Sequence, residues 1–228
     1  MHRMIIFDID GTLLMTGGAG KSAFNSVFAE LYQISEAWQD ILPDGRTDPS
    51  LIKEIFQKNL GYKPETKAYQ KVAKIYIEKM EQALQAAPRF RLLPGITDLL
   101  ETLFQRYPQA LGIATGNFED SAQLKLKRAG LENYFSFGGF GSDSEDRLAL
   151  TRKALERGRQ ALKRWIPPED VFLVGDTPHD IRCGKLLGMN TVAVASGSHS
   201  KKELSSYQPD FLLQDFSQVE EVISIFEI

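Results

Sequence analysis

The sequence predicts a doubly wound, mostly parallel α/β sheet with an inserted all-helical cap domain. Short apolar runs alternate with helical patterns along most of the chain, which is typical of a parallel sheet that has helices on both faces. Residues 16–88 break this alternation and contain helical patterns only. A helical block placed after the first strand therefore predicts a separate cap.

Five apolar runs give the expected strands of the sheet. The first is "MIIFDID" near the N-terminus, which ends in two carboxylates. The others are "ALGIAT" (110–115), "VFLVGD" (171–176), "TVAVAS" (191–196) and "FLL" (211–213). Their length and their freedom from charge before the last residues favour strands buried on both faces.

The expected helices follow from apolar residues that recur at helical spacing. In the core, one such stripe comes after Pro94-Gly95 and comprises Ile96, Leu99, Leu100, Leu103 and Phe104. In the cap, the stripes are Ala23, Phe24, Val27, Phe28 and Leu31; Leu51, Ile52, Ile55 and Phe56; and Val72, Ile75, Tyr76, Met80 and Ala83. We assign residues 1–15 and 89–228 to the α/β core and 16–88 to the cap, with hinges at 16–20 and 87–93.

Composition limits the class of protein. Of the 228 residues, 43% are hydrophobic and 25% are charged, which is ordinary for a globular chain with a sizeable core. The formal charge of −3 gives no reason to expect a nucleic-acid partner. The single cysteine, Cys183, excludes an internal disulfide, and no apolar run reaches the length of a membrane span. We expect a cytoplasmic protein with no membrane partner.

Polar residues gather where the expected strands end. Asp8 and Asp10 close the first run, Thr115 closes the second and Asp176 closes the third. In an open parallel sheet, ligands bind outside the carboxyl ends of the strands. The convergence of three strand ends therefore predicts one site.

The Asp8 and Asp10 pair suits phosphoryl transfer. Residues two apart in an extended segment face the same way, with backbones about 6–7 Å apart. One carboxylate can then attack phosphorus while the other handles the proton of the leaving group. Two carboxylates repel an anionic phosphate, so a hard cation such as Mg²⁺ is needed, and Asp176 supplies a further ligand.

Three segments carry a family resemblance. "DIDGT", "IATGN" and "VGDTPHD" resemble motifs I, II and IV of the haloacid dehalogenase (HAD) superfamily, in that order. The phosphoglycolate phosphatase-like subgroup, with a helical cap after motif I, is the most similar group. The resemblance covers nearly the whole chain.

The resemblance implies roles for the acids. Asp8 would be the nucleophile, and Asp10 would protonate the leaving oxygen and later activate water. Mg²⁺ would be held by Asp8, the backbone carbonyl of Asp10 and Asp176, with Asp180 as an outer or water-mediated partner.

The resemblance also implies a phosphate-binding segment. The Thr115 hydroxyl, with the backbone of Gly116 and Asn117, would hold phosphoryl oxygens. The helix expected from Glu119 would favour such an anion at its N-terminus.

Motif III differs from the usual pattern of the family, which has a lysine there. Arg147 lies at the expected place in "GSDSEDRLALTRKALERG", and arginine keeps the positive charge and can bind phosphate through two donors. Lys153 is the alternative, six residues later. We favour Arg147.

The resemblance implies a Mg²⁺-dependent phosphatase for small phosphate monoesters, phosphoglycolate-like compounds or sugar phosphates, acting through an aspartyl-phosphate. The presence of Asp10 favours phosphoryl transfer over dehalogenation, and Thr12 favours phosphatases over sugar phosphomutases. A phosphomutase of the same family and a catalytically silent phospho-ligand-binding protein remain alternatives. The expected partner is a small phosphorylated metabolite, and the chain could be a monomer or a homodimer.

Other candidates carry alternative interpretations. "GAGKS" resembles the end of a nucleotide-binding P-loop, but that motif needs glycine where Met15 stands. Arg46 either contacts the substrate or belongs to a helix-capping turn in which Asp48 is the N-cap residue. We expect His179 to be a solvated loop residue, and Lys21 could lie near the cleft between cap and core.

Overall fold

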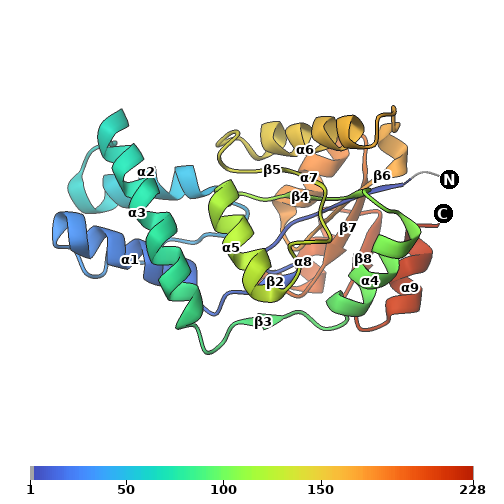
Figure 1. The fold of residues 1–228 in the computed structure, drawn as a ribbon, viewed down its shortest axis with the longest axis horizontal. Coiled ribbons are helices and arrows are strands. Elements are labelled where there is room, and N and C mark those ends of the chain that lie inside the picture. The colour runs from blue at the N-terminus through green and yellow to red at the C-terminus, as the bar shows by residue number, and fades with distance from the viewer. Residues whose placement is uncertain (1–2, 228) are drawn as a thin grey trace.

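The computed structural model describes residues 3–227 of the chain. Its centre is a six-stranded sheet whose strand order is β5-β4-β1-β6-β7-β8 and whose neighbours are all parallel (Figure 1). The strands are β1 (Met4–Phe7), β4 (Leu111–Ala114), β5 (Phe137–Gly139), β6 (Val171–Gly175), β7 (Asn190–Val194) and β8 (Phe211–Leu213). The fold class predicted from the sequence is confirmed.

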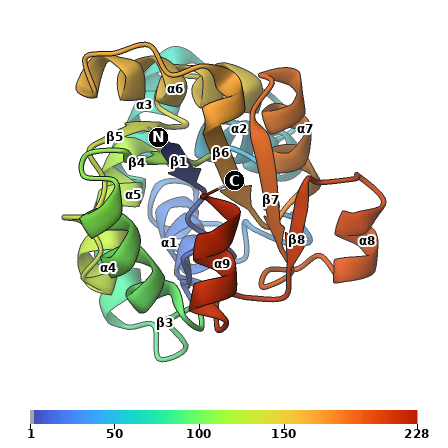
Figure 2. The same cartoon turned by 90° about the vertical axis from the view of Figure 1, so that its right-hand side faces the viewer.

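Helices cover both faces of this sheet (Figure 2). One face carries α6 and α7, and the other carries α4 and α9. The core helices are α4 (Ile96–Arg106), α5 (Glu119–Ala129), α6 (Arg147–Ala161), α7 (Pro178–Leu186), α8 (Lys201–Ser205) and α9 (Val219–Ile225), with a 3₁₀ turn at Pro168–Asp170.

The buried side chains of β1 alternate between the two faces. Ile5 and Phe7 belong to the hydrophobic cluster that includes α4, α5 and α9, whereas Met4 and Ile6 belong to the cluster that includes α6. Successive side chains of a strand point to opposite faces, so an apolar run without alternation is what a strand buried on both sides requires.

Two details of the core differ from the predictions. Strand β5 was not predicted, because its sequence "FGG" has no apolar run. A side chain at Gly139 would collide with the Leu150 carbonyl of α6, so glycine permits the helix to pack closely there. On α4, Phe104 shares the predicted face but remains 38% exposed.

Three helices lie between the first strand of the sheet and the rest of the core in the sequence. They are α1 (Ala19–Tyr32), α2 (Asp48–Leu60) and α3 (Thr66–Gln85), and they share a hydrophobic cluster separate from those of the sheet. Figure 1 places them together beyond one end of the sheet. A short antiparallel pair, β2 (Leu14–Met15) and β3 (Arg91–Leu92), flanks this block in the sequence. The division into a core and a cap at residues 16–88 stays a prediction.

The start of α2 corrects one prediction. Its N-cap residue is Thr47 rather than Asp48: the Thr47 hydroxyl accepts the Ser50 N–H, and the Ser50 hydroxyl faces the Thr47 N–H in a capping box. Asp48 is the first residue of the helix, and Pro49 follows in the first turn, where its missing N–H costs nothing. The Asp48 carboxylate is therefore available for contacts elsewhere.

None of the helices in the described residues 3–227 combines the length and the apolar character needed to cross a bilayer.

Candidate active site

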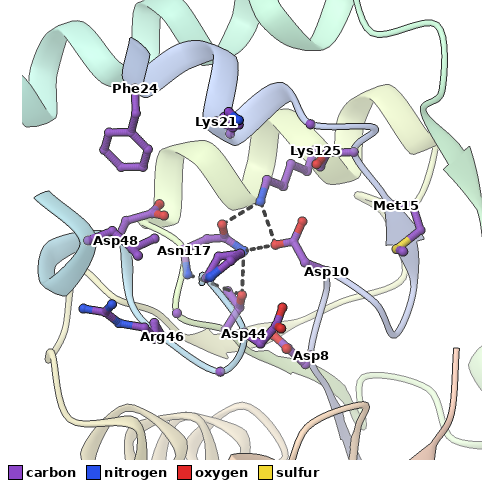
Figure 3. A pocket seen from close by; sticks show the side chains of 18 of the residues that line it. Asp8, Asp10, Met15, Lys21, Phe24, Asp44, Arg46, Asp48, Asn117 and Lys125 are labelled. Atoms are coloured by element: carbon purple, nitrogen blue, oxygen red, sulfur yellow. Dashed lines mark hydrogen bonds and ion pairs between the residues drawn. The ribbon is translucent and has the colours of Figure 1, made fainter. Parts of the chain in front are cut away.

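Three adjacent strands end at the same level. In the parallel register, Phe7 of β1 pairs with Ile113 of β4 and Val174 of β6. The polar residues that follow these strands therefore meet at one edge of the sheet, where they border a cavity of about 490 Å³ (Figure 3). Of the residues predicted for the site, the cavity is lined by Asp8, Asp10, Arg46, Thr115, Gly116, Asn117, Arg147 and Asp176; Asp180 lies behind them.

Asp8 lies at the bottom of the site beside a buried arginine. Its carboxylate Oδ2 lies 2.9 Å from Nη2 of Arg147, and the same Nη2 lies 2.7 Å from Oδ1 of Asp180. All three side chains are less than a tenth exposed. Arg147 therefore bridges two acids that would otherwise repel each other in a poorly solvated place.

The Asp176 carboxylate is closely packed by its neighbours. Its Oδ1 accepts a hydrogen bond of 3.1 Å from the Thr12 hydroxyl. A Cβ atom added to Gly11 or Gly197 would lie within 2.3 Å of the Asp176 carboxylate, so both positions require glycine. The carboxylate is thus fixed from several sides, as expected for a group that must keep a defined direction.

Asp8, Asp176 and Asp180 form a buried acidic cluster. Each offers a carboxylate oxygen within 4.8 Å of the others. Burial raises the pKa of Asp8 to about 6, against the opposing charge of Arg147, and burial also raises the pKa of Asp176, with the Asp8 charge adding to the effect. Oδ1 of Asp8 is buried and accepts no hydrogen bond from the described residues. Carboxylate oxygens grouped in this way can hold a hard cation.

Asp180 has both carboxylate oxygens occupied. Oδ1 accepts from Arg147, and Oδ2 accepts from the Thr177 hydroxyl at 2.6 Å and from the Thr177 N–H at 3.2 Å. Thr177 and Asp180 form the capping box at the start of α7. Asp180 therefore fixes a helix terminus and orients Arg147 at the same time.

Asp10 faces the open part of the cavity, and its side chain is 43% exposed. Its Oδ2 accepts hydrogen bonds from Asn117 Nδ2 at 2.7 Å and from Lys125 Nζ at 2.6 Å (Figure 3). Ile9, between the two acids, is fully buried. Asp8 and Asp10 therefore present one deeply buried and one accessible carboxylate to the same cavity, an arrangement suited to nucleophilic attack with proton transfer.

Thr115 and Gly116 follow β4, the strand next to β1, and line the same cavity as the acids. Thr115 is 1% exposed, and its hydroxyl accepts a hydrogen bond of 2.7 Å from Asn117 Nδ2. Gly116 approaches the backbone before α2 so closely that an added Cβ would lie 2.0 Å from the Arg46 carbonyl. The Gly116 carbonyl accepts the Asp48 N–H at 2.8 Å. The loop before α2 is thus seated on the strand end of β4.

Arg46 and His179 lie at the rim. The Arg46 guanidinium forms an ion pair with Glu54 of α2, and Figure 3 shows its side chain directed away from Asp8 and Asp10. The hydrogen bond from Arg46, together with its positive charge, lowers the pKa of Glu54. His179 is exposed, as expected, but it lies in the first turn of α7 rather than in a loop. Its ring packs against Gly45, where an added Cβ would lie 2.4 Å away. Burial on that side lowers the pKa of His179.

The two candidates for motif III lie in different places. Arg147 begins α6 and contacts the acids. Lys153 lies further along α6, with a side chain that is 48% exposed and an ion pair only to Glu156 within the described chain. The structure brings Arg147, and not Lys153, to the cavity.

Two residues of the site were missed by sequence reasoning, and the first is Lys125. It is 4% exposed, lies on α5, and contacts Asp10 and Asn117. A signal was present: Lys125 occurs at helical spacing from Ser121 and Ala122, on the stripe that α5 buries. A lysine on the buried stripe of a helix indicates a partner, because burying a lone ammonium is costly.

The second is Asp48, which links α2 to α5. Its Oδ2 accepts the Phe118 N–H at 2.8 Å and the Ser121 hydroxyl at 3.0 Å, and its Oδ1 lies 3.4 Å from the Tyr76 hydroxyl. Burial raises the pKa of Asp48 to about 6, although Lys125 and the hydrogen bonds oppose the shift and Asp10 adds to it. This carboxylate joins the helical block to the core.

We expect Asp48→Asn to remove a pH dependence of stability. The folded pKa lies above the ordinary value, so the wild-type carboxyl is most favourable when protonated, and its contribution is lost as the pH rises from about 4 through about 6. Relative to Asp48→Asn, the free energy of unfolding of the wild type should fall by up to about 3 kcal/mol across that window. Urea unfolding at pH 4 and pH 7 measures this difference.

The matched control for this experiment is Asp40→Asn. Asp40 is an exposed acid in the segment between α1 and α2, and its pKa is lowered by its hydrogen bond to Lys58, the opposite direction. Because Asp40→Asn keeps Asp48, the free energy of unfolding of the wild type relative to this variant should not fall across the same pH window. Parallel pH profiles for the wild type and Asp48→Asn would contradict the assignment of a raised pKa to Asp48.

The sequence is similar to bacterial proteins along nearly the whole chain. The sequence is 29% identical over 221 residues to "Probable phosphatase IndB" of Dickeya dadantii, covering 96% of this chain and 92% of that protein. It is 27% identical over 218 residues to "Pyrophosphatase PpaX" of Oceanobacillus iheyensis, covering 95% and 94% of the two chains. Both relatives are thus matched along nearly their entire length.

Solved structures share the fold. The chain is similar to CbbY from Rhodobacter sphaeroides, solved in complex with phosphate, with a TM-score of 0.73, 22% identity and 96% coverage of both chains. It is also similar to a predicted phosphoglycolate phosphatase from Haemophilus somnus, with a TM-score of 0.72, 19% identity and coverage of 97% and 98%.

The sequence model of the family described as haloacid dehalogenase-like hydrolase matches residues 5–194. This range contains the acidic cluster and the cavity-lining strand ends described above. Together with the site geometry, the match shows that the chain belongs to the haloacid dehalogenase-like hydrolase family.

Proposed function

We propose that this hydrolase is a Mg²⁺-dependent phosphatase that cleaves small phosphate monoesters through an aspartyl-phosphate on Asp8. The observation that carries the proposal is the pairing of a buried Asp8, next to Arg147, with an accessible Asp10 in one cavity. The names of the relatives, a probable phosphatase and a pyrophosphatase, support the same class of reaction.

The first step uses both acids. A carboxylate oxygen of Asp8 attacks phosphorus, and the ester P–O bond breaks as the new bond forms. Asp10 gives its proton to the leaving oxygen, so the alcohol departs neutral. Arg147, which already touches Asp8, offsets the negative charge that gathers around the nucleophile.

The second step regenerates the enzyme. Asp10, now ionised, removes a proton from water as the water oxygen attacks phosphorus, and the bond between phosphorus and Asp8 breaks. The Thr115 hydroxyl and the backbone of Gly116 and Asn117 line the cavity where phosphoryl oxygens would sit. Inorganic phosphate is the product.

The acidic cluster fits a divalent cation. Its donors are hard carboxylate oxygens, and the buried Oδ1 of Asp8 has no hydrogen-bond partner among the described residues. Asp8, Asp176 and the backbone carbonyl of Asp10 would hold Mg²⁺, and Asp180, whose oxygens are occupied, would act from the outer shell. When bound, Mg²⁺ neutralises phosphoryl charge and polarises the P–O bonds.

The rim of the cavity favours a substrate with a second negative charge. Lys21, Arg89 and Arg91 line the cavity, and none of them has an ion pair or a hydrogen bond from its side chain within the described chain. Figure 3 shows Lys21 across the cavity from Asp8. These free cations suit a phosphoglycolate-like ester better than a sugar phosphate with a neutral leaving group.

We further propose that the protein acts in the cytoplasm on a small phosphorylated metabolite. Its single cysteine, Cys183, is free and buried, which suits a reducing compartment. As a monomer or as a homodimer, the chain carries all the side chains named for the reaction.

We expect phosphate release that depends on Mg²⁺ and is abolished by EDTA. The test is a panel of small monoesters arranged in pairs that differ in one carboxylate on the leaving group. The ester with the carboxylate should have the higher kcat/KM in each pair. Release that persists in EDTA contradicts the metal proposal, and preference for the neutral partner contradicts the substrate class. A folded protein that releases no phosphate favours the phosphomutase or the silent ligand-binding alternative.

A further inference from the structure

Lys125 is the only lysine among the described residues that is both deeply buried and part of the cavity wall. It lies in the middle of α5, where the helix packs its stripe of Ser121, Ala122 and Leu126 inward. An ammonium in such a place is stable only if its donors are satisfied. Its partners therefore show what the residue is placed to do.

Both partners belong to the reaction site. Nζ of Lys125 lies 2.6 Å from Oδ2 of Asp10 and 2.6 Å from Oδ1 of Asn117. Asn117 in turn donates from Nδ2 to the same Oδ2 of Asp10, at 2.7 Å. The three side chains form a closed triangle of hydrogen bonds, which Figure 3 shows as dashed lines.

The two carboxylate oxygens of Asp10 differ in their hydrogen bonds. Oδ2 accepts from both Lys125 and Asn117, whereas Oδ1 accepts no hydrogen bond from any described side chain or backbone group. Because the Asp10 side chain is 43% exposed, packing alone does not fix its rotamer. The two bonds to Oδ2 supply that constraint and leave Oδ1 free.

We propose that Lys125 is the positioning residue for Asp10: with Asn117 it anchors Oδ2, so that Oδ1 is presented to the leaving-group oxygen. This inference rests on the phosphatase function proposed above. In the first step the bond between Asp8 and phosphorus forms, the ester P–O bond breaks, and the proton on Oδ1 moves to the departing oxygen. A misdirected Asp10 leaves that oxygen to depart as an anion.

The consequence depends on the leaving group. An alkyl oxygen departs poorly without a proton, whereas p-nitrophenolate is stable as an anion and needs little help. Loss of Asp10 positioning should therefore harm alkyl phosphates much more than p-nitrophenyl phosphate. A residue that serves phosphate binding or folding would affect both substrates equally, because the phosphoryl group is the same in each.

The test is kcat/KM of Lys125→Met for p-nitrophenyl phosphate, phenyl phosphate and an alkyl phosphate. This parameter reports on steps up to P–O cleavage and excludes the later attack of water, which is common to all substrates. We expect a loss of about 10²-fold or more for the alkyl ester and less than about tenfold for p-nitrophenyl phosphate. Lys127→Met, two residues along the same helix and exposed, is the matched control and should leave all three values unchanged.

A second variant covers the case in which Lys125→Met does not fold. Asn117→Ala removes the other bond to Oδ2 and should show the same selectivity in milder form. An equal loss for all substrates in the variants, or no loss, overturns the positioning role. A wild-type protein that releases phosphate from none of the esters overturns the phosphatase proposal itself, and this inference with it.

Discussion

Asp8→Asn should reduce phosphate release by at least about 10³-fold while leaving the protein folded. The amide has nearly the shape of the carboxylate, but it cannot supply the nucleophile that attacks phosphorus. Arg147 keeps its bond to Asp180, so the substitution leaves no buried cation without a partner. Burial raises the pKa of Asp8 to about 6, so a neutral side chain there should keep or increase the thermal midpoint.

The covalent step gives a second measurement. Acid quenching during turnover, followed by mass spectrometry, should locate the phosphoryl group on the wild-type peptide that contains Asp8, and the label should be absent from Asp8→Asn. Asp40→Asn is the control, because this exposed acid pairs only with Lys58 in the described chain. An Asp8→Asn variant with release near the wild-type rate would remove Asp8 from the mechanism.

Sequence patterns predicted most of the framework because the physical signals were local. Strands β1, β4 and β6 are apolar runs that end in polar residues, and the sheet topology then brings those ends together. Strand β5 had no such signal, since two of its three residues are glycine and its pairing with β4 is decided by tertiary packing. Local pattern therefore predicts elements better where burial is continuous along the chain.

Sequence patterns did not predict those residues of the site whose contacts join parts of the chain that are far apart in the sequence. A lysine in a helix ordinarily faces solvent, and only the approach of Asp10, 115 residues earlier, makes Lys125 part of the cavity. Asp48 looked like an N-cap because it precedes Pro49, yet its carboxylate reaches Phe118, just before α5, and Ser121 on that helix. The spacing of residues in α5 places Lys125 on the buried stripe but does not show which residue it meets, and the contacts of Asp48 have no counterpart in the periodicity of the chain.

Arg147→Ala should lower kcat/KM by about 10²–10³-fold. The guanidinium bridges Asp8 and Asp180 at 2.9 and 2.7 Å, so its removal takes away the cation beside the nucleophile and leaves two buried acids opposed. Although burial disfavours its charge, Asp8 and Asp180 together raise the pKa of Arg147, so it remains a cation throughout any practical pH range. Arg147→Lys keeps the charge but loses the planar fork of donors, and an intermediate loss is expected.

The effects of Arg147→Ala on stability and on catalysis can be measured separately. Breaking a buried ion pair costs about 3–5 kcal/mol, so part of the lost activity could come from unfolding. Added guanidinium ion should restore turnover of folded Arg147→Ala, because it refills the space with the missing charge, whereas it would not rescue an unfolded chain. Lys153→Ala is the matched control on the same helix, since Lys153 is exposed and pairs only with Glu156 within the described chain. If Lys153→Ala were the damaging change and Arg147→Ala were not, the cation of the site would have been assigned to the wrong residue.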